Sequence, residues 1–133
     1  MKTIKLVVLF LLVFSCSKDR NDKPEVITLD KINGIWKWES TCGGITGTCG
    51  YSSDLHYSEI IFSNNGIFTE KWNDTVYLTS DYTIVKVDDY YGTLSLDNII
   101  CSQVLSEHID YSIVIIDNKL VIERGDLFCT YSK

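Results

Sequence analysis

The fold is decided by residues 61–72, where two apolar-alternating runs flank a turn: Ile61-Phe62-Ser63-Asn64-Asn65-Gly66-Ile67-Phe68-Thr69-Glu70-Lys71-Trp72. A short loop that contains Asn-Gly between such runs is a strong signal for a β-hairpin. Successive side chains of a strand point to opposite faces, so every second residue of the second run shares a face. The sequence therefore predicts an antiparallel hairpin with Phe68, Glu70 and Trp72 on one face.

The same alternation continues on both sides of this hairpin, from Gly34 to the C-terminus. Residues 35–40 place Trp36 and Trp38 on one face of a first strand, and separate strands are predicted at 76–79 and 82–87. No helical pattern of useful length intervenes, so consecutive strands should pair antiparallel. We predict an all-β fold, an eight-stranded antiparallel meander closed into a barrel, because closure removes the exposed edges of an open sheet.

The composition of the 133 residues supports this class and excludes others. The chain has 8 Tyr, 5 Phe and 3 Trp but no Ala, which makes a helical bundle very improbable. Its 12 basic and 18 acidic residues give a formal charge of −6. If Lys2 and Lys5 are lost with a leader, 10 basic residues remain against 18 acidic ones, a charge of −8. Such an excess repels phosphate backbones, so nucleic-acid binding is not expected.

Residues 1–15 have the layout of a secretory signal peptide, with Lys2 and Lys5 before an apolar run and a small residue before Cys16. The run is too short for a membrane-spanning helix, which needs about 20 residues. Its end, Leu12-Val13-Phe14-Ser15-Cys16, resembles the lipobox of bacterial lipoproteins. The resemblance implies cleavage before Cys16, a diacylglycerol on its sulfur and an acyl group on its new amino terminus. An ordinary signal peptide with a fortuitous cysteine is the alternative.

Residues 16–31 are predicted to be the lipidated cysteine and a flexible tether, because most of this stretch is charged and poor in large apolar residues. Two or three acyl chains together anchor a protein stably, whereas a single chain does not. Ser17 after the lipidated position resembles lipoproteins that are sent to an outer membrane. We therefore expect a location in the bacterial cell envelope, as an outer-membrane lipoprotein that faces the periplasm or the cell surface.

Four further cysteines, a number that allows two disulfides, remain in the barrel region of residues 32–133. Disulfides are the default in an exported chain, and three connectivities are possible. We favour Cys42–Cys49, which closes a glycine-rich loop, and Cys101–Cys129. A zinc site is the alternative, but no cysteine pair has the short spacing of a zinc knuckle and no histidine lies near a cysteine. No metal is predicted.

Gly34-Ile35-Trp36 resembles the Gly-x-Trp signature of lipocalins. Residues 32–133 resemble more closely the compact lipocalin-like domains of bacterial lipoproteins, through this start, Gly43-Gly44, the Asn64-Asn65-Gly66 hairpin and Cys129-Thr130-Tyr131. In lipocalins the motif's tryptophan packs across the closed end of the barrel beneath a basic side chain, usually an arginine, of the final strand. The resemblance gives Trp36 this barrel-closing role. Its basic partner would be Arg124 or Lys133.

Residues suited to catalysis are few, and no nucleophile elbow, metalloprotease helix or phosphate-binding loop occurs. His56 and His108 are expected at the surface or the barrel rim. Glu70 either points into the barrel as a polar group of a ligand pocket or faces outward. The candidate ligand-lining residues are Trp38, Phe68, Glu70 and Trp72. We expect neither an enzyme nor a cofactor.

Two functions remain open from the sequence. The first is a membrane-anchored, monomeric binding module for one small apolar or amphipathic ligand, since an eight-stranded barrel is wide enough for one. The second is an interaction or inhibitor module that binds an envelope protein through the disulfide-closed loop at the barrel mouth, because a rigid loop loses less entropy on docking.

Overall fold

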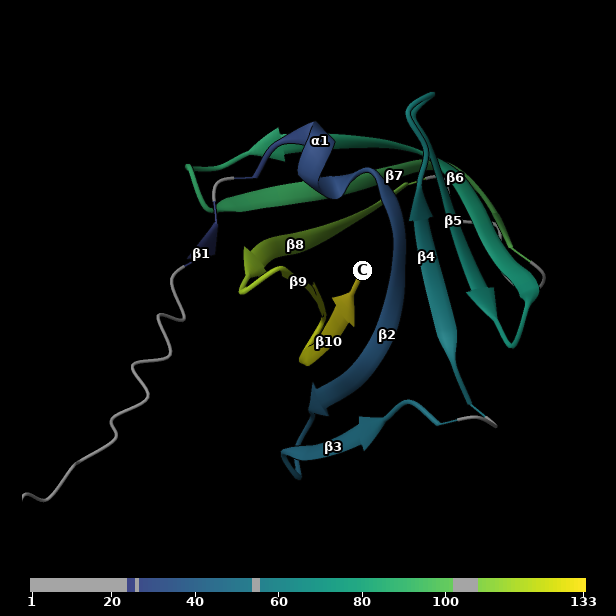
Figure 1. Ribbon diagram of the computed structural model, residues 1–133, viewed down its shortest axis with the longest axis vertical. Coiled ribbons are helices and arrows are strands. Elements are labelled where there is room, and N and C mark those ends of the chain that lie inside the picture. The colour runs from purple at the N-terminus through teal and green to yellow at the C-terminus, as the bar shows by residue number, and fades with distance from the viewer. Residues whose placement is uncertain (1–23, 26, 54–55, 102–107) are drawn as a thin grey trace, which may run out of the picture.

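The computed structural model describes residues 24–25, 27–53, 56–101 and 108–133, and it confirms the antiparallel barrel (Figure 1). The predicted signal peptide and the predicted lipidation site at Cys16 lie outside the described residues. The eight strands that form the wall are β2 (Gly34–Gly43), β4 (Ser58–Phe62), β5 (Ile67–Trp72), β6 (Thr75–Lys86), β7 (Tyr91–Cys101), β8 (His108–Ile116), β9 (Lys119–Arg124) and β10 (Leu127–Ser132).

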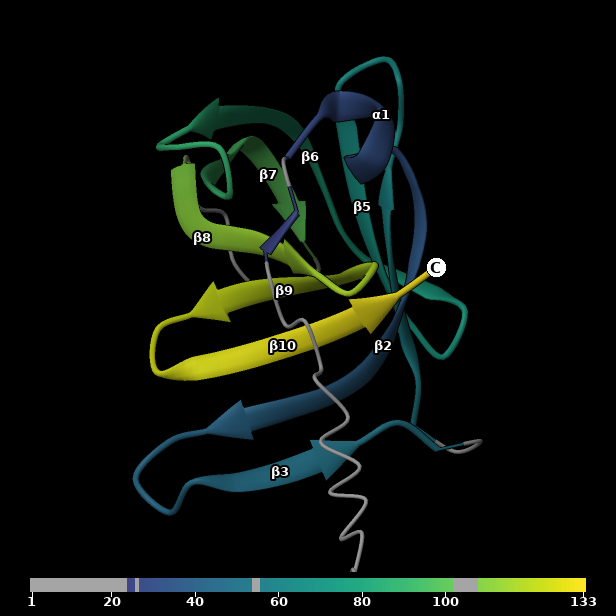
Figure 2. The ribbon, with the colours of Figure 1, turned by 60° about the vertical axis from the view of Figure 1, so that its left-hand side comes forward.

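The wall closes because each of these strands pairs antiparallel with the next and β10 pairs back onto β2. The predicted hairpin joins β4 to β5, with Phe62 opposite Phe68. Two short strands lie outside the closed cycle: β1 (Pro24–Glu25) pairs with β8, and β3 (Thr48–Tyr51) pairs with the second half of β2. In Figures 1 and 2 the β2–β3 hairpin extends from the end of the barrel opposite helix α1 (Leu29–Ile32).

Residues 75–86 form one strand, whereas the sequence analysis placed two strands there. The alternation runs through the expected break, because Leu78, Ser80 and Tyr82 are all buried. A register shift between Thr79 and Asp81 of β6, where it pairs with β7, absorbs the irregularity. Ser80 points inward like Leu78 and Tyr82, so the inward–outward alternation continues through it and the strand does not end there.

The folded domain begins before residue 32, because the end of the stretch that was predicted to be a tether packs against the barrel. Ile27 is 1% exposed and its backbone N–H donates to the carbonyl of Asp89. Thr28 caps α1, which contributes the fully buried Ile32. Ile27 and Ile32 help to anchor this segment, since each buried aliphatic side chain contributes about 1.5–3 kcal/mol.

The capped end of the barrel, defined by α1, Trp36 and Lys133, holds much of the apolar core. Phe62 packs edge-on against Phe68 with ring centroids 5.1 Å apart, and against Tyr82 at 5.2 Å. The Tyr82 hydroxyl donates to the side-chain oxygen of Asn33, next to α1. Further core side chains that are almost fully buried are Ile60, Leu94, Leu96, Ile113, Ile115, Leu120 and Ile122.

His108 should give the stability of the barrel a pH dependence. On the outer surface its ring nitrogens lie 2.7 Å from Asp97 and 3.1 Å from Asp110. Hydrogen bonds to Asp97 and Asp110 raise the pKa of His108 above its ordinary value, and the bond to Asp97 has the larger effect. Because the pKa is raised in the folded protein, protonated His108 stabilises the fold. This stabilisation is complete below the unfolded-state pKa of about 6.5 and is lost as the pH rises through the folded-state pKa.

NMR titration of the His108 ring should therefore give a midpoint above about 6.5. Asp97→Asn should move that midpoint down, because it removes the carboxylate that lies 2.7 Å from the ring. A midpoint of His108 that does not respond to Asp97→Asn would contradict the assignment.

Candidate functional site

Trp36 and Lys133 close the capped end together. The Trp36 indole N–H donates to the carbonyl of Ile32 at 2.6 Å, and the Lys133 Nζ lies 4.7 Å from the Trp36 ring centroid. Lys133 also donates to the carbonyls of Lys31 and Asn33, which ties the last residue of the chain to α1. Of the two proposed basic partners Lys133 takes this place. Arg124 does not, because β9 ends with it at the opposite, far end of the barrel.

Arg124 instead forms an ion pair with Glu70 on the inner face of the far end. The two terminal nitrogens of its guanidinium donate to the two carboxylate oxygens of Glu70, at 3.1 and 3.2 Å. The side chain of Glu70 is 5% exposed and that of Arg124 is 24% exposed. The face of β5 that carries Phe68 and Glu70 thus points into the barrel, which settles the alternative left open by the sequence.

The surroundings of this pair are aromatic and hydroxylated. The Arg124 guanidinium carbon lies 5.2 Å from the centroid of the Tyr111 ring. Burial disfavours the charge on Arg124, but Tyr131 and Glu70 outweigh this effect, so the pKa of the guanidinium is raised. Burial also raises the pKa of the Tyr131 hydroxyl, which is therefore neutral at pH 7. The far end of the barrel thus holds one cation and one anion beside neutral phenols.

Two buried polar atoms have no hydrogen-bond partner among the described residues. They are the Nε of Arg124 and the hydroxyl oxygen of Ser80. Ser80 points inward from β6, the strand next to β5, and is 2% exposed. Most buried polar atoms of native proteins are hydrogen-bonded, and one left alone costs about 1–3 kcal/mol. Within the described ranges, these two atoms are left unsatisfied.

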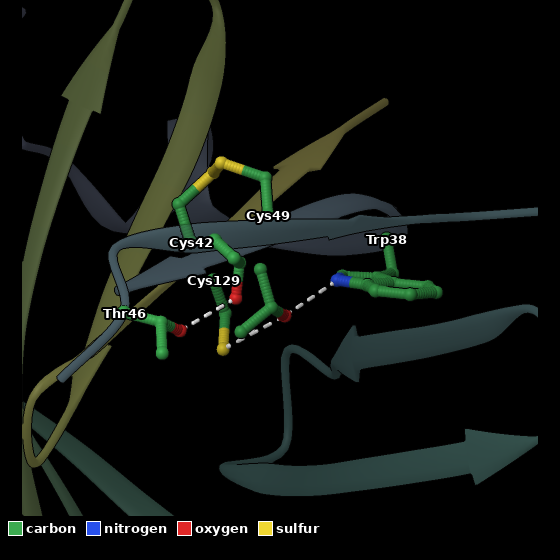
Figure 3. The surroundings of a disulfide bond; sticks show 7 residues. Trp38, Cys42, Thr46, Cys49 and Cys129 are labelled. Atoms are coloured by element: carbon green, nitrogen blue, oxygen red, sulfur yellow. Dashed lines mark hydrogen bonds between the residues drawn. A yellow bond between two sulfur atoms is a disulfide. The ribbon is translucent and has the colours of Figure 1, made fainter. Parts of the chain in front are cut away.

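Two tryptophans stand at the rim of the same end. Trp38 of β2 and Trp72 of β5 have ring centroids 6.3 Å apart with planes inclined at 36°. Trp72 follows Glu70 on the inner face and is 45% exposed. The Trp38 indole N–H donates to the Thr41 hydroxyl, which in turn contacts the Cys129 sulfur (Figure 3). This hydrogen-bond chain fixes one ring, while the other keeps an accessible apolar face.

A cleft of about 480 Å³ opens beside Trp38, where β2 changes partner. The first half of β2 pairs with β4 through Lys37, and the second half pairs with β3 from Ser40 onward. The two neighbours diverge between these points. Clefts of roughly 300–1,000 Å³ are typical of small-molecule sites. The lining side chains are Lys37, Trp38, Ser52, Ser53, Tyr57, Ser58 and Glu59.

Three of the four candidate ligand-lining residues, Trp38, Glu70 and Trp72, therefore lie at the far end of the barrel. Phe68 does not, since it belongs to the core against Phe62. The sequence analysis missed Arg124 as the partner of Glu70. The alternation of Leu120, Ile122 and Arg124 in β9 could have indicated that Arg124 faces inward.

The predicted Cys42–Cys49 disulfide is present, and it joins residues directly opposite each other in the β2–β3 hairpin (Figure 3). The predicted bond between Cys101 and Cys129 is absent. Cys101 ends β7 and Cys129 lies in β10, with β8 and β9 between them. Three strand spacings amount to about 14 Å along the sheet, far more than the roughly 7 Å that a disulfide spans.

Replacing Cys42 and Cys49 together by serine should lower the free energy of unfolding by about 2.5 kcal/mol, because the unfolded chain regains the entropy of an open loop. Urea titration at neutral pH would measure the difference. A reducing agent should then weaken the wild-type protein and leave the double variant unchanged. Equal sensitivity of the two proteins to the reductant would contradict this account.

The chain matches no protein-family model, no curated protein and no solved structure. Among the described residues no cluster of three or more His, Cys, Asp or Glu side chains is arranged to hold a metal ion. Within the same ranges no helix has the length and apolarity needed to cross a membrane. The far end of the barrel brings together a buried ion pair and two rim tryptophans, and a cleft opens beside one of them.

Proposed function

We propose that this chain is a lipocalin-like lipoprotein, anchored by lipid at Cys16, whose barrel holds one small amphipathic molecule at its far end. The observation that carries the proposal is the buried Arg124–Glu70 pair on the inner face next to the Trp38–Trp72 rim. Mass spectrometry of the native protein should find the lipid on residue 16. That anchor is supported by the sequence pattern of residues 12–16.

A buried ion pair needs an explanation, because stability alone does not favour it. Removing two charges from water costs several kcal/mol per ion, and apolar replacements of such pairs are often neutral or stabilising. The Arg124–Glu70 pair is therefore better explained by recognition of a polar group. The rim rings supply apolar surface for the rest of the ligand, since tryptophan offers a large flat area with little entropy to lose.

The cleft beside Trp38 provides room for such a molecule. Its lining combines one indole face with three serine hydroxyls and the phenol of Tyr57. Trp38 belongs both to this cleft and to the rim pair, so one bound molecule can contact the two regions. Apolar walls with a few placed polar groups are the usual composition of a small-molecule site.

Binding can be tested with N-phenyl-1-naphthylamine, an uncharged apolar dye whose fluorescence rises on leaving water. We expect saturable binding to the full chain and a loss of about tenfold or more in affinity for Trp72→Ala, because a large aromatic contact is removed. Tyr90→Ala is the matched control, since Tyr90 is 44% exposed and Trp72 is 45% exposed. Fluorescence that rises without saturation, or equal losses in both variants, would contradict the proposal.

A second candidate function, binding of an envelope protein through the β2–β3 hairpin, is favoured by one observation. Ile45, at the tip of this disulfide-closed hairpin, is fully exposed, and Tyr51 is 69% exposed. Apolar side chains on a rigid projecting loop are suited to docking at low entropic cost. A partner that is cross-linked to the wild-type protein in intact cells should then be lost in Ile45→Ser. Persistence of that cross-link would remove the support.

A further inference from the structure

We infer that the ligand's polar group is an uncharged hydrogen-bond acceptor, such as a hydroxyl or a carbonyl, and that carboxylates and ammonium groups are selected against. The inference rests on the proposed function and names its ligand class. It follows from the charge balance of the site and from the donor that the described residues leave unsatisfied.

The positive charge of Arg124 and the negative charge of Glu70 balance each other. Both terminal nitrogens of the guanidinium donate to Glu70, so the charge of the arginine is already balanced, and the N–H groups that remain, Nε–H among them, belong to a neutral pair. An anion placed here would lie beside the Glu70 carboxylate, and like charges this close repel strongly in a desolvated site. A cation would meet the same difficulty beside Arg124.

The cleft repeats this balance at its edge. Among the described lining residues the charged ones are Lys37 and Glu59, which lie directly opposite each other in the β2–β4 pairing. The other described lining groups are hydroxyls and aromatic rings. Within the described part of the chain, the two charged groups on the inner face and the two at the cleft therefore cancel in pairs.

The unsatisfied donor indicates what the site does accept. The Nε–H of Arg124 has no acceptor among the described residues. A hydroxyl or carbonyl oxygen that enters beside the ion pair would accept from this Nε–H without disturbing the bonds to Glu70. A neutral acceptor thus completes the hydrogen bonding, whereas an ion has to break the existing pair to find a counter-charge.

Three ligands with the same ten-carbon chain test the inference: decan-1-ol, decanoate and decylammonium. Each competes with N-phenyl-1-naphthylamine for the full-length protein at pH 7. We expect decan-1-ol to displace the dye at a concentration about tenfold or more below either ion, since like-charge contacts penalise the ions. Glu70→Gln should shift the preference toward decanoate, because it leaves the charge of Arg124 unbalanced.

The outcomes separate the two claims. Saturable dye binding with decanoate or decylammonium equal to or stronger than decan-1-ol would overturn the inference and leave the proposed function standing. Absence of saturable dye binding would remove the proposed function, and the inference with it. Near-UV circular dichroism would check the fold of Glu70→Gln, and the ranking on the wild-type protein decides the question even if that variant does not fold.

Discussion

Glu70→Leu, with Arg124 unchanged, should lower the free energy of unfolding by about 3–5 kcal/mol, because it leaves a buried guanidinium without its counter-ion. Glu70 is 4% exposed, and its two carboxylate oxygens are the acceptors for Arg124. The guanidinium cannot escape by losing its proton, because arginine is not deprotonated in proteins. Urea-induced unfolding followed by tryptophan fluorescence measures the loss.

The matched control is the double variant Glu70→Leu with Arg124→Met. Removing both charges should recover most of the stability lost in the single variant, because well-packed apolar side chains replace an ion pair at little net cost. The two sites should therefore be strongly non-additive in a double-mutant cycle. If the double variant loses as much free energy of unfolding as the two single variants together, Glu70 and Arg124 contribute independently. That result would contradict the claim that they stabilise the fold as a pair.

The same double variant links stability to function. If it folds well and no longer binds the neutral dye or decan-1-ol, the ion pair is retained for recognition and not for folding. A site that costs stability and supplies binding is a common arrangement, because buried polar groups are placed where a ligand needs them. The far end of the barrel fits this description better than the capped end, where the buried contacts are predominantly apolar.

Local patterns were sufficient to predict the barrel. The Asn64-Asn65-Gly66 turn and the alternation of neighbouring runs specified antiparallel hairpins, and the absence of long helical patterns excluded parallel crossovers. The pairing of Trp36 with a basic side chain depended instead on a family resemblance, and the sequence left two candidates. Lys133 took the position because β10 ends at the capped end, whereas β9 ends with Arg124 at the far end.

Long-range register was what the sequence could not supply. Glu70 and Arg124 are 54 positions apart, and their contact depends on how the closed sheet brings β5 and β9 to face each other. The missing Cys101–Cys129 bond has the same origin, because cysteine counting says nothing about the two strands that separate these residues. A charged side chain inside a barrel can find its partner on a strand that is not its neighbour, so hairpin-level rules do not identify the pair.

Phe68→Ala should have the opposite effect to Trp72→Ala. It should lower the stability of the protein strongly without weakening dye binding. Phe68 is fully buried and packs against Phe62 at the capped end, so truncation should cost about 3–5 kcal/mol through lost burial and a residual cavity. Phe128→Ala is the matched control, because Phe128 is 49% exposed and its truncation should change stability by about 0.5 kcal/mol or less.

Dye affinity measured on the folded fraction of Phe68→Ala should equal that of the wild type, because Phe68 lies in the core and Trp72 stands at the rim of the far end. Trp72→Ala should weaken dye binding with little loss of stability, since a ring that is 45% exposed adds little to the core. If Phe68→Ala weakens dye binding as much as Trp72→Ala does, the ligand occupies the barrel axis down to the capped end. The rim and cleft would then not be its site.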